Sequence, residues 1–469
     1  MRATTSSPCR GRAKSAIDVR YFVCLLARWL FFTDFGAAFR PLRVRLEPMA
    51  RIRRQFPSVW AAALTLLRAF IGALALSGAA FSAVAAAPGK ITGSQQAAFR
   101  GFIETLWPLA EARGVARATF DSAFAGVTFD PTVAASAGSQ PEFVRPIWDY
   151  VGGAVTADRI QRGRDKAGSE ALWLARAKDL YGVDGAVILG VWGLETDFGG
   201  FVGSSNIIRS LASLAYIHFQ GDYFRDELLA ALVILEEGDI APSLMRGSWA
   251  GAMGQTQFMP SSYLAYAVAF QRHDRRDIWT SEADAIGSTA NYLAKHGWTK
   301  DLPWGFEVRL PAKFALTGAD SSSPASFSSF AARGVTKADG SPLPASGEGR
   351  LLILAGLNGP VFLVTSNFDA IKTYNNSTAY ALSVGLLGTA VSGGPALVAR
   401  WPTRDHPLTA AQIQKLQSQL KKMGYDVGKI DGKIGDTLRS AVSTYQERNG
   451  LPPDGYANQA LFTRLSASR

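Results

Sequence analysis

Cysteine and histidine are both scarce in this sequence of 469 residues. The two cysteines, Cys9 and Cys24, lie within the first 85 residues, so the rest of the chain can form neither a disulfide nor a cysteine-based nucleophile or metal site. The four histidines show no His-Glu-x-x-His spacing, which argues against a zinc hydrolase. We therefore expect no metal ion and no cofactor.

An excess of positive charge is also missing from most of the chain, although the net charge is +11. Residues 1–85 hold 13 of the 49 basic residues and 3 of the 38 acidic residues, which leaves 36 basic and 35 acidic residues in the remainder. A balance of +1 beyond residue 85 removes the electrostatic support for a nucleic-acid binder.

No apolar run reaches the ~20 residues that a membrane span needs. Arginines follow Met49, residues 69–80 form a short apolar run, and an Ala-Val-Ala sequence ends at Ala85, which is the layout of a secretory signal peptide. A transmembrane anchor is the weaker alternative, and no cysteine follows that would carry a lipid. We expect an extension plus signal at 1–85, with the signal at 49–85, and an exported, soluble, periplasmic protein without a stable membrane span.

The mature chain divides into regions of different composition. Residues 96–400 are mostly rich in alanine, leucine and aromatic residues at helical spacing, and alternating or short apolar runs within 305–370 predict a strand-containing insert. Glycine and proline mark a linker at 401–407. The expected fold class is mainly α, with an α+β character supplied by the insert.

Residues 408–466 predict a separate module of three helices. Thr409 can cap the first helix, and Asp431-Gly432 and Asp454-Gly455 are suited to turns between helices. Apolar residues recur at helical spacing on each helix. These residues are Ile413, Leu416 and Leu420, then Leu438, Val442 and Tyr445, and finally Leu461 and Leu465.

Glu195 is the first candidate catalytic residue. A helix that Asp184 can cap and that ends at Gly199-Gly200 places Glu195 near its C-terminus, on one stripe with Trp192. Apolar surroundings and the negative helix end both favour the protonated carboxyl, which is the form that a general acid for glycosidic cleavage needs. The same spacing also fits an ordinary glutamate facing solvent.

Two polar segments are candidates for sugar binding. A glycine-rich loop after Ser248 contains Gln255 and Gln257, whose amides suit hydroxyl and acetamido groups, although the loop also reads as a simple lead into a helix near Ser261. Tyr374 to Tyr380 combines aromatic and amide side chains that suit sugar rings, and it reads equally as the start of a helix with Tyr380 in the core.

Four motifs in this order resemble the lytic murein transglycosylase B family. They are Glu195-Thr196-x-x-Gly199, Gly251-Ala252-Met253-Gly254-x-x-Gln257-Phe258-Met259-Pro260-Ser261-Ser262, the segment from Asp284 to Trp298, and Tyr374-Asn375 with Tyr380. The resemblance covers about residues 96–400. The C-terminal region separately resembles the peptidoglycan-binding domain type 1, through Leu416-Gln417-x-x-Leu420, Ile430-Asp431-Gly432 and Asp454-Gly455.

The resemblance implies a lysozyme-like helical core in which Glu195 is the single catalytic acid. It also implies a set of substrate-binding residues and peptidoglycan glycan strands as the partner. The substrate-binding residues are Ser248, Gln257, Tyr374, Asn375, Tyr380 and, on a looser motif, Tyr150.

The chain departs from the family at one point. Some members bind calcium in an EF-hand-like loop, but Gln271 to Asp277 is short here and places cationic and imidazole side chains where oxygen ligands are needed. We do not predict calcium.

The expected activity is non-hydrolytic cleavage of the MurNAc–GlcNAc bond with formation of a 1,6-anhydromuramyl product. A hydrolytic muramidase on the same scaffold is one alternative, and it needs a second carboxylate, for which Asp222, Glu227 and Glu236 are candidates. A non-catalytic cell-wall binding protein is the other alternative.

Overall fold

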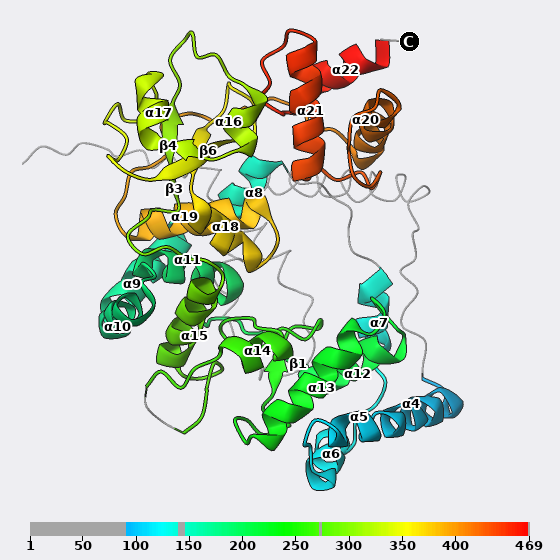
Figure 1. Cartoon of the computed structure of the whole chain (residues 1–469). Helices are drawn as coiled ribbons and strands as arrows, with labels where there is room; N and C mark the ends of the chain where they lie inside the picture. The colour runs from blue at the N-terminus through cyan, green and yellow to red at the C-terminus, as the bar shows by residue number, and fades with distance from the viewer. Residues whose placement is uncertain (1–90, 139–145, 272–273, 468–469) are drawn as a thin grey trace, which may run out of the picture. The chain divides into compact units, whose positions relative to one another are not determined.

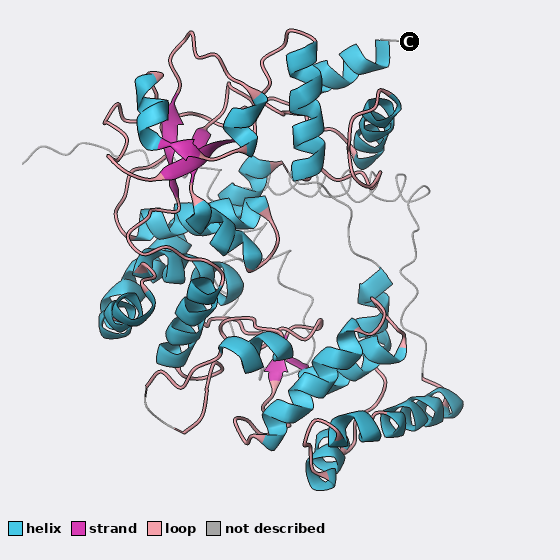
Figure 2. Ribbon diagram, in the orientation of Figure 1, coloured by secondary structure: helices cyan, strands magenta, loops and turns pink. Residues whose placement is uncertain are grey.

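The computed structural model describes residues 91–138, 146–271 and 274–467, whose elements are labelled in Figure 1 and coloured by type in Figure 2. The predicted extension and signal peptide at 1–85 lie outside these residues. Helices dominate and a small sheet is inserted among them, so the predicted fold class is confirmed. No helix of the described residues is long and apolar enough to cross a membrane.

Most of the helices share one large hydrophobic core. In chain order they are α4 (Gly93–Thr105), α5 (Trp107–Glu111), α6 (Arg117–Phe124), α7 (Pro131–Gly138), α8 (Ile147–Ala154), α9 (Ala157–Ser169), α10 (Ala171–Tyr181), α11 (Gly185–Thr196), α12 (Ile207–Tyr216), α13 (Tyr223–Glu236), α14 (Pro260–Tyr266), α15 (Glu282–Lys295), α18 (Ser366–Thr373) and α19 (Thr378–Val391).

Helices α11 and α19 pack against each other at unusually close range near the centre of this core (Figure 1). A Cβ atom on Gly190 would lie 2.4 Å from the carbonyl oxygen of Val384, and one on Gly388 would lie 2.3 Å from that of Ala186. The contact therefore requires glycine on both helices. It brings the end of α11 beside the beginning of α19, although the two helices are far apart in sequence.

The insert is an antiparallel sheet of five strands in the order β4-β6-β7-β3-β5 (Figure 2). Strands form within residues 305–370, where the apolar runs of the sequence predict them. Their inward side chains form a core of their own. The elements of the insert are β3 (Gly305–Arg309), α16 (Gly318–Ser322), β4 (Ala325–Ser326), α17 (Phe327–Ala332), β5 (Thr336–Lys337), β6 (Glu348–Ile353) and β7 (Val361–Val364). A second, two-stranded pairing of β1 (Ser205–Asn206) with β2 (Arg246–Gly247) has no counterpart in the sequence prediction.

Three helices follow near the C-terminus and have a separate hydrophobic core. They are α20 (Ala410–Lys422), α21 (Asp436–Arg448) and α22 (Gln459–Ala467). Thr409 caps α20 in a reciprocal capping box with Gln412, as the sequence predicts for its N-terminus. Every apolar residue predicted for the three stripes is buried in this core.

Candidate active site

Glu195 lies in the last turn of α11, a helix that is buried on nearly all sides. The predicted start of this helix is correct, because Asp184 occupies the N-cap position. The prediction that Asp184 caps the helix through its side chain is wrong. The Asp184 carboxylate makes no capping hydrogen bond and instead pairs with Lys178 at 2.9 Å. The burial of α11 stabilises the helix without a side-chain cap, and its glycines allow that burial.

The helix ends at Thr196, three residues before the predicted stop at Gly199-Gly200. Asp197 already adopts the left-handed conformation, with φ of 53°. That conformation costs a non-glycine residue about 1 kcal/mol. Arg159 and Arg162 hold the Asp197 carboxylate at 3.3 Å and 2.8 Å, and these two ion pairs favour the early stop.

Arg159 also fastens a second element of the site. Its guanidinium donates to the carbonyl oxygens of Gly153 at 3.1 Å and Ala154 at 2.5 Å, which end helix α8. Helix α8 carries Tyr150, one of the predicted substrate-binding residues. Arg159 thus joins the helix of Tyr150 to the residue that ends the helix of Glu195.

Among the described residues, the Glu195 carboxyl group accepts one hydrogen bond, from the hydroxyl of Tyr380 at 2.6 Å. Burial raises the pKa of Glu195 to about 7, and the Tyr380 hydrogen bond opposes that rise. The two effects are the causes of the shift among the described residues, so no neighbouring carboxylate contributes to it. A glutamic acid with this pKa is substantially protonated near neutral pH.

Three predicted tyrosines surround this carboxyl group. Burial and then the negative charge of Glu195 raise the pKa of Tyr150, Tyr374 and Tyr380. The rings of Tyr374 and Tyr380 lie nearly parallel, at 17° and 6.3 Å between centroids. Asn375 follows Tyr374 and is exposed to solvent, so its amide is accessible. The structure therefore brings Tyr150, Tyr374 and Tyr380 together around Glu195.

Ser248 and Gln257 lie at the two ends of the glycine-rich loop. The Ser248 hydroxyl accepts from the amide of Ala252 at 3.0 Å and closes a tight turn. Gln257, in the left-handed conformation, donates from its side-chain nitrogen to the carbonyl oxygens of Val202 at 3.1 Å and Gly254 at 2.9 Å. Both side chains therefore shape the loop through bonds within the protein.

Gln255 does not have the sugar-binding role that we expected from its amide. Its side chain is buried, with 4% exposed, and its oxygen accepts from the indole nitrogen of Trp192 at 3.0 Å. The backbone carbonyl of Gln255 accepts from the hydroxyl of Thr196 at 2.9 Å. A Cβ atom on Gly199 would lie 2.5 Å from the Gln255 side-chain oxygen, so that glycine is needed. Gln255 holds the C-terminal end of α11, the helix of Glu195, in place.

Tyr292 on α15 is part of the site but was missed in the sequence analysis. Its ring lies 4.7 Å from that of Tyr374, and its hydroxyl donates to the carbonyl oxygen of Thr373 at 3.0 Å. His296 stacks on the other side of Tyr292 at 3.9 Å. The spacing of Tyr292 and His296 by one helical turn was visible in the sequence, but nothing there indicated which segment they contact.

None of the three candidate second carboxylates contributes to the environment of Glu195. Glu227 accepts from the backbone amide of Ser261 at 2.9 Å and from its hydroxyl at 2.6 Å. Asp222 pairs with Arg225 at 2.9 Å, and Glu236 accepts from a backbone amide at 3.0 Å. These carboxylates support helices and loops of the fold.

The described residues contain no group of three or more histidine, cysteine, aspartate or glutamate side chains that could hold a metal ion. Residues 272 and 273 of the loop considered for calcium lie outside the described residues. In the described remainder, Arg276 pairs with Asp239 at 2.6 Å and with Glu237. A guanidinium group thus already neutralises the two carboxylates beside this loop.

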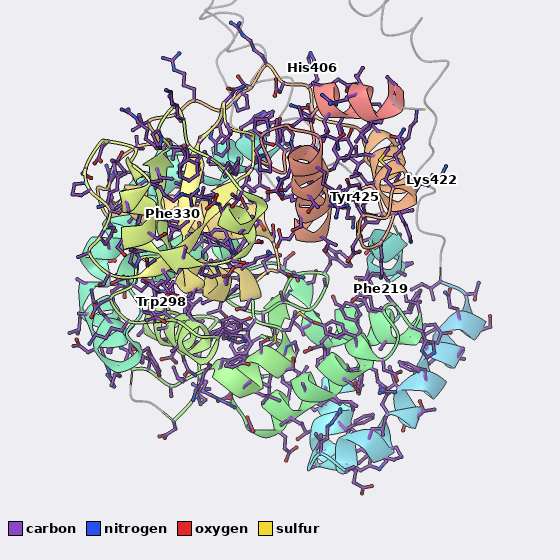
Figure 3. The ribbon with its side chains drawn as sticks, turned by 45° about the horizontal axis from the view of Figure 1, so that its top comes forward. Phe219, Trp298, Phe330, His406, Lys422 and Tyr425 are labelled. Atoms are coloured by element: carbon purple, nitrogen blue, oxygen red, sulfur yellow. The ribbon has the colours of Figure 1, made fainter. Side chains whose placement is uncertain are left out.

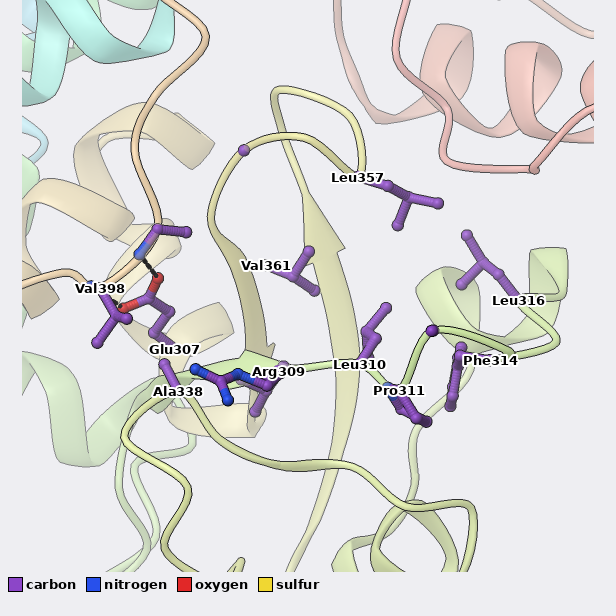
Figure 4. A pocket seen from close by; sticks show the side chains of 14 residues that line it. Glu307, Arg309, Leu310, Pro311, Phe314, Leu316, Ala338, Leu357, Val361 and Val398 are labelled. Carbon is purple, nitrogen blue, oxygen red and sulfur yellow. Dashed lines mark hydrogen bonds between the residues drawn. The ribbon is translucent and has the colours of Figure 1, made fainter.

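A cavity of about 510 Å³ lies beside the sheet of the insert (Figure 4). Its lining contains none of the predicted site residues. The carboxylate of Glu307, at one side of this cavity, accepts from the backbone amides of Val398 at 2.7 Å and Ala399 at 2.8 Å. This hollow therefore has no free acid for the chemistry discussed here.

Comparison with known proteins identifies the family of the chain. Residues 98–389 match the transglycosylase SLT domain family, and residues 409–465 match the putative peptidoglycan binding domain. Membrane-bound lytic murein transglycosylase B of Escherichia coli K12 is 36% identical over 242 residues, which are 51% of this chain and 65% of that protein. The chain therefore matches less than two thirds of this relative.

Two solved structures illustrate the similarity. SltB3 from Pseudomonas aeruginosa, in complex with NAG-anhNAM-pentapeptide, is 44% identical with a TM-score of 0.74, over 79% of this chain and 99% of that chain. The Escherichia coli lytic transglycosylase Slt35, in complex with calcium, is 32% identical with a TM-score of 0.53, over 63% of this chain and 92% of that chain. The chain belongs to the lytic transglycosylases of the SLT domain family and carries a peptidoglycan-binding domain at its C-terminal end.

Proposed function

We propose that the protein cleaves the MurNAc–GlcNAc bond of peptidoglycan without water and leaves a 1,6-anhydromuramyl end, with Glu195 as the single acid. The observation that carries this proposal is the carboxyl group of Glu195, whose pKa of about 7 keeps it protonated near neutrality. It is further supported by the similarity to SltB3, which was solved with NAG-anhNAM-pentapeptide.

In the proposed reaction, Glu195 protonates the glycosidic oxygen and the bond to the muramyl C1 breaks. The N-acetyl group of the substrate stabilises the oxocarbenium-like centre. The resulting Glu195 carboxylate removes the proton from the muramyl C6 hydroxyl, which attacks C1 and closes the anhydro ring. The proton taken in the second step restores the acid, so one carboxyl group with a pKa near neutrality serves both steps.

The neighbouring side chains have proposed supporting roles. Tyr380 orients the acid through its hydrogen bond to the Glu195 carboxyl group. Tyr150, Tyr374 and the exposed amide of Asn375 contact the sugars. The backbone of the loop closed by Ser248 and Gln257 forms another wall of the cleft, so these two residues position that wall.

Hydrolysis needs a second carboxylate to activate water. Glu227, Glu236 and Asp222 are engaged with other partners, so no observation favours the hydrolytic alternative over the one-acid route. The presence of a buried acid with a raised pKa likewise argues against a purely binding function.

We further propose that residues 96–400 form the catalytic domain, that 401–407 form a linker and that 408–466 bind the cell wall. The signal peptide at 49–85 would direct the protein to the periplasm, where its substrate lies. N-terminal sequencing of the exported protein is expected to start between Ala86 and Pro88. Recovery of the intact N-terminus on the exported protein would contradict this assignment.

The central test compares Glu195→Gln with Glu236→Gln, which makes the same change on an exposed carboxylate. Turnover of purified sacculi should fall at least ~10²-fold for Glu195→Gln and stay unchanged for Glu236→Gln. Mass spectrometry of wild-type products should find anhydromuramyl ends, which differ from reducing ends by one water. Reducing ends alone, or full turnover by folded Glu195→Gln protein, would refute the proposal.

A further inference from the structure

A cavity of about 630 Å³ lies between the α20–α22 helices and the catalytic region, and we call it the interface cavity. Its wall on the catalytic side includes Trp148, Lys372 and Thr378, and its wall on the α20–α22 side includes Lys433 and Arg439. Two contacts join the two sides near the cavity: Asp436 forms an ion pair with Lys372 and accepts a hydrogen bond from the Thr378 hydroxyl at 3.5 Å.

The lining of the interface cavity carries more positive than negative charge. Asp436 forms an ion pair with Lys372 and its charge also acts on Arg439, whereas Lys433 and Arg439 form no close ion pair with any residue in the described part of the chain. The guanidinium of Arg439 also donates no hydrogen bond to a described residue, and burial lowers its pKa. A desolvated guanidinium without a hydrogen-bonding partner is unfavourable until an anion occupies the site.

Arg439 faces two hollows at once. It lines the interface cavity and also a neighbouring cavity of about 480 Å³, and Thr378 and Asp436 are likewise shared by both. The guanidinium can therefore bond to an anion in either hollow. Arginine is well suited to carboxylates because its donors match their two oxygens.

The interface cavity shares two segments of the chain with the substrate cleft that we propose around Glu195. Trp148 lies on α8 two residues before Tyr150, and Thr378 lies on α19 two residues before Tyr380. Residues spaced by two on a helix point in nearly opposite directions. The cleft and the interface cavity therefore lie on opposite sides of the same two segments.

A peptide branch of the substrate is long enough to reach from the cleft to the interface cavity. A helix with its side chains is about 10–12 Å across. An extended peptide of five residues spans ~17 Å. A peptide attached to a sugar in the cleft can therefore pass the wall and enter the interface cavity, whereas the sugar rings themselves remain in the cleft.

We propose that the interface cavity binds the acidic peptide branches of the strand whose sugars occupy the Glu195 cleft, through Arg439 and Lys433. Carboxylates of the peptide pair with Arg439 and Lys433, and its aliphatic side chains pack on Trp148, Leu354 and Ile434, which also line the cavity. The α20–α22 helices thereby take part in substrate recognition as well as in wall attachment. This inference rests on the proposed function, since it concerns the same substrate.

The test uses the full-length protein and two substrates, peptide-bearing glycan strands and the same strands stripped of peptide by an amidase. The double variant Arg439→Gln/Lys433→Gln should raise KM for peptide-bearing strands about tenfold and change it less than twofold for stripped strands. The matched control is Lys422→Gln, an exposed cation on α20 outside the cavity (Figure 3), and it should behave as wild type on both.

Two further variants protect the test against a folding defect. Arg439→Lys keeps the charge and should retain most of the preference for peptide-bearing strands. Lys433→Gln alone changes an exposed residue and should raise KM for peptide-bearing strands about threefold. Equal effects on the two substrates, or no effect on either, would overturn the peptide site.

A binding measurement separates this inference from the proposed function. Peptide-bearing and stripped glycan fragments are titrated calorimetrically into Glu195→Gln protein, with and without Arg439→Gln. A loss of affinity confined to peptide-bearing fragments supports the site even if the wild type proves to lack lytic activity. Normal lytic activity with no peptide dependence of binding would overturn the site and leave the proposed function standing.

Discussion

Helix α11 and the C-terminal helices each place a carboxyl group near a turn, but the two environments shift its pKa in opposite directions. Asp431, in the turn after α20, accepts hydrogen bonds from the Gln417 amide at 3.1 Å and from the backbone amide of Lys433 at 2.9 Å, and these bonds lower its pKa. Glu195, at the end of α11, accepts one bond from Tyr380 and is otherwise desolvated, so its pKa rises. One carboxyl group is stabilised as an anion and the other as an acid.

The difference extends to the glutamines beside these groups. Gln417 and Gln446 each accept from a turn glycine, Gly432 at 3.0 Å and Gly455 at 2.8 Å, and each also donates to the aspartate of that turn. Gln255 instead bonds to Trp192 and leaves Glu195 without an amide donor. In the turns that support folding, the aspartate receives hydrogen bonds from the neighbouring glutamine. Glu195 receives no hydrogen bond from Gln255, so its charged form is not stabilised in this way.

The largest effect on this comparison is expected from Glu195→Gln in stability measurements across pH. Because the folded-state pKa of Glu195 is raised to about 7, the folded protein binds its proton more tightly than the unfolded chain does. The stability contributed by the protonated form is present below the unfolded pKa and is lost as pH rises through 7. At pH 8, Glu195→Gln should therefore increase the free energy of unfolding by about 2–3 kcal/mol.

The matching substitution in the C-terminal helices is Asp431→Asn, which should decrease the free energy of unfolding where Glu195→Gln increases it. It weakens the hydrogen bonds to an anion, and we expect a loss of about 0.5 kcal/mol near neutral pH that disappears as pH falls through the lowered pKa of Asp431. Denaturant titrations at pH 4.5 and pH 8 measure the change for Glu195→Gln, and titrations continued below pH 3.8 follow the disappearance of the Asp431→Asn effect. Equal effects of Glu195→Gln at the two pH values would contradict the contrast.

The next effect concerns the satisfied turn after α21. Gln446→Ala removes the hydrogen-bond acceptor of the buried Gly455 amide. We expect the free energy of unfolding of the C-terminal helices to fall by about 2 kcal/mol. Gln414→Ala, on an exposed position of α20, is the control and should change stability little. A loss of the same size in both variants would show that the effect belongs to helix propensity.

A smaller effect is expected at the link between α8 and α11. Arg159→Met removes the bonds to Ala154 and Asp197 together, so Tyr150 and Glu195 lose their common support. Turnover should fall about tenfold, mainly in kcat, which corresponds to ~1.4 kcal/mol. Arg162→Met removes only the pairing with Asp197 and should reduce kcat less. An equal reduction in both would assign the effect to Asp197 alone.

The smallest effect is a shift in pH dependence. The Tyr380 hydroxyl stabilises the ionised form of Glu195, so Tyr380→Phe should raise the pKa of the acid further. The alkaline limb of kcat/KM should move upward by about half a pH unit. A downward shift would mean that the hydroxyl stabilises the protonated form, and the contrast with Asp431 would then be weaker than described.

The sequence was informative where local rules decide the structure. Spacing between neighbouring residues is enough to predict the Thr409 cap, the strands β3, β6 and β7 of the insert and the apolar stripes of α20 to α22. The fate of Gln255 could not be read in this way, because its partner Trp192 is 63 residues away. The same holds for Glu227, which caps a helix that begins 33 residues later.

The site shows the same division. Glu195 was identified from its helical stripe and from the family resemblance, while its pKa depends on burial that only the packed core provides. Tyr292 was missed because its role arises from contact with Tyr374. Tyr292 lies on α15, whereas Tyr374 lies at the end of α18. Residues that act through distant partners leave no local pattern in a sequence.

The hydrogen bonds of Glu307 determine how far the peptidoglycan-binding domain can move. They fix Val398 and Ala399 to β3 (Figure 4), and Trp401 packs against the main core, so the connection to Leu408 begins at Pro402. Six extended residues span at most ~21 Å. Such a short tether gives the cleft a high effective concentration near any strand that the domain holds. After one cleavage, the next bond of the same strand is therefore more accessible than any bond of a distant strand.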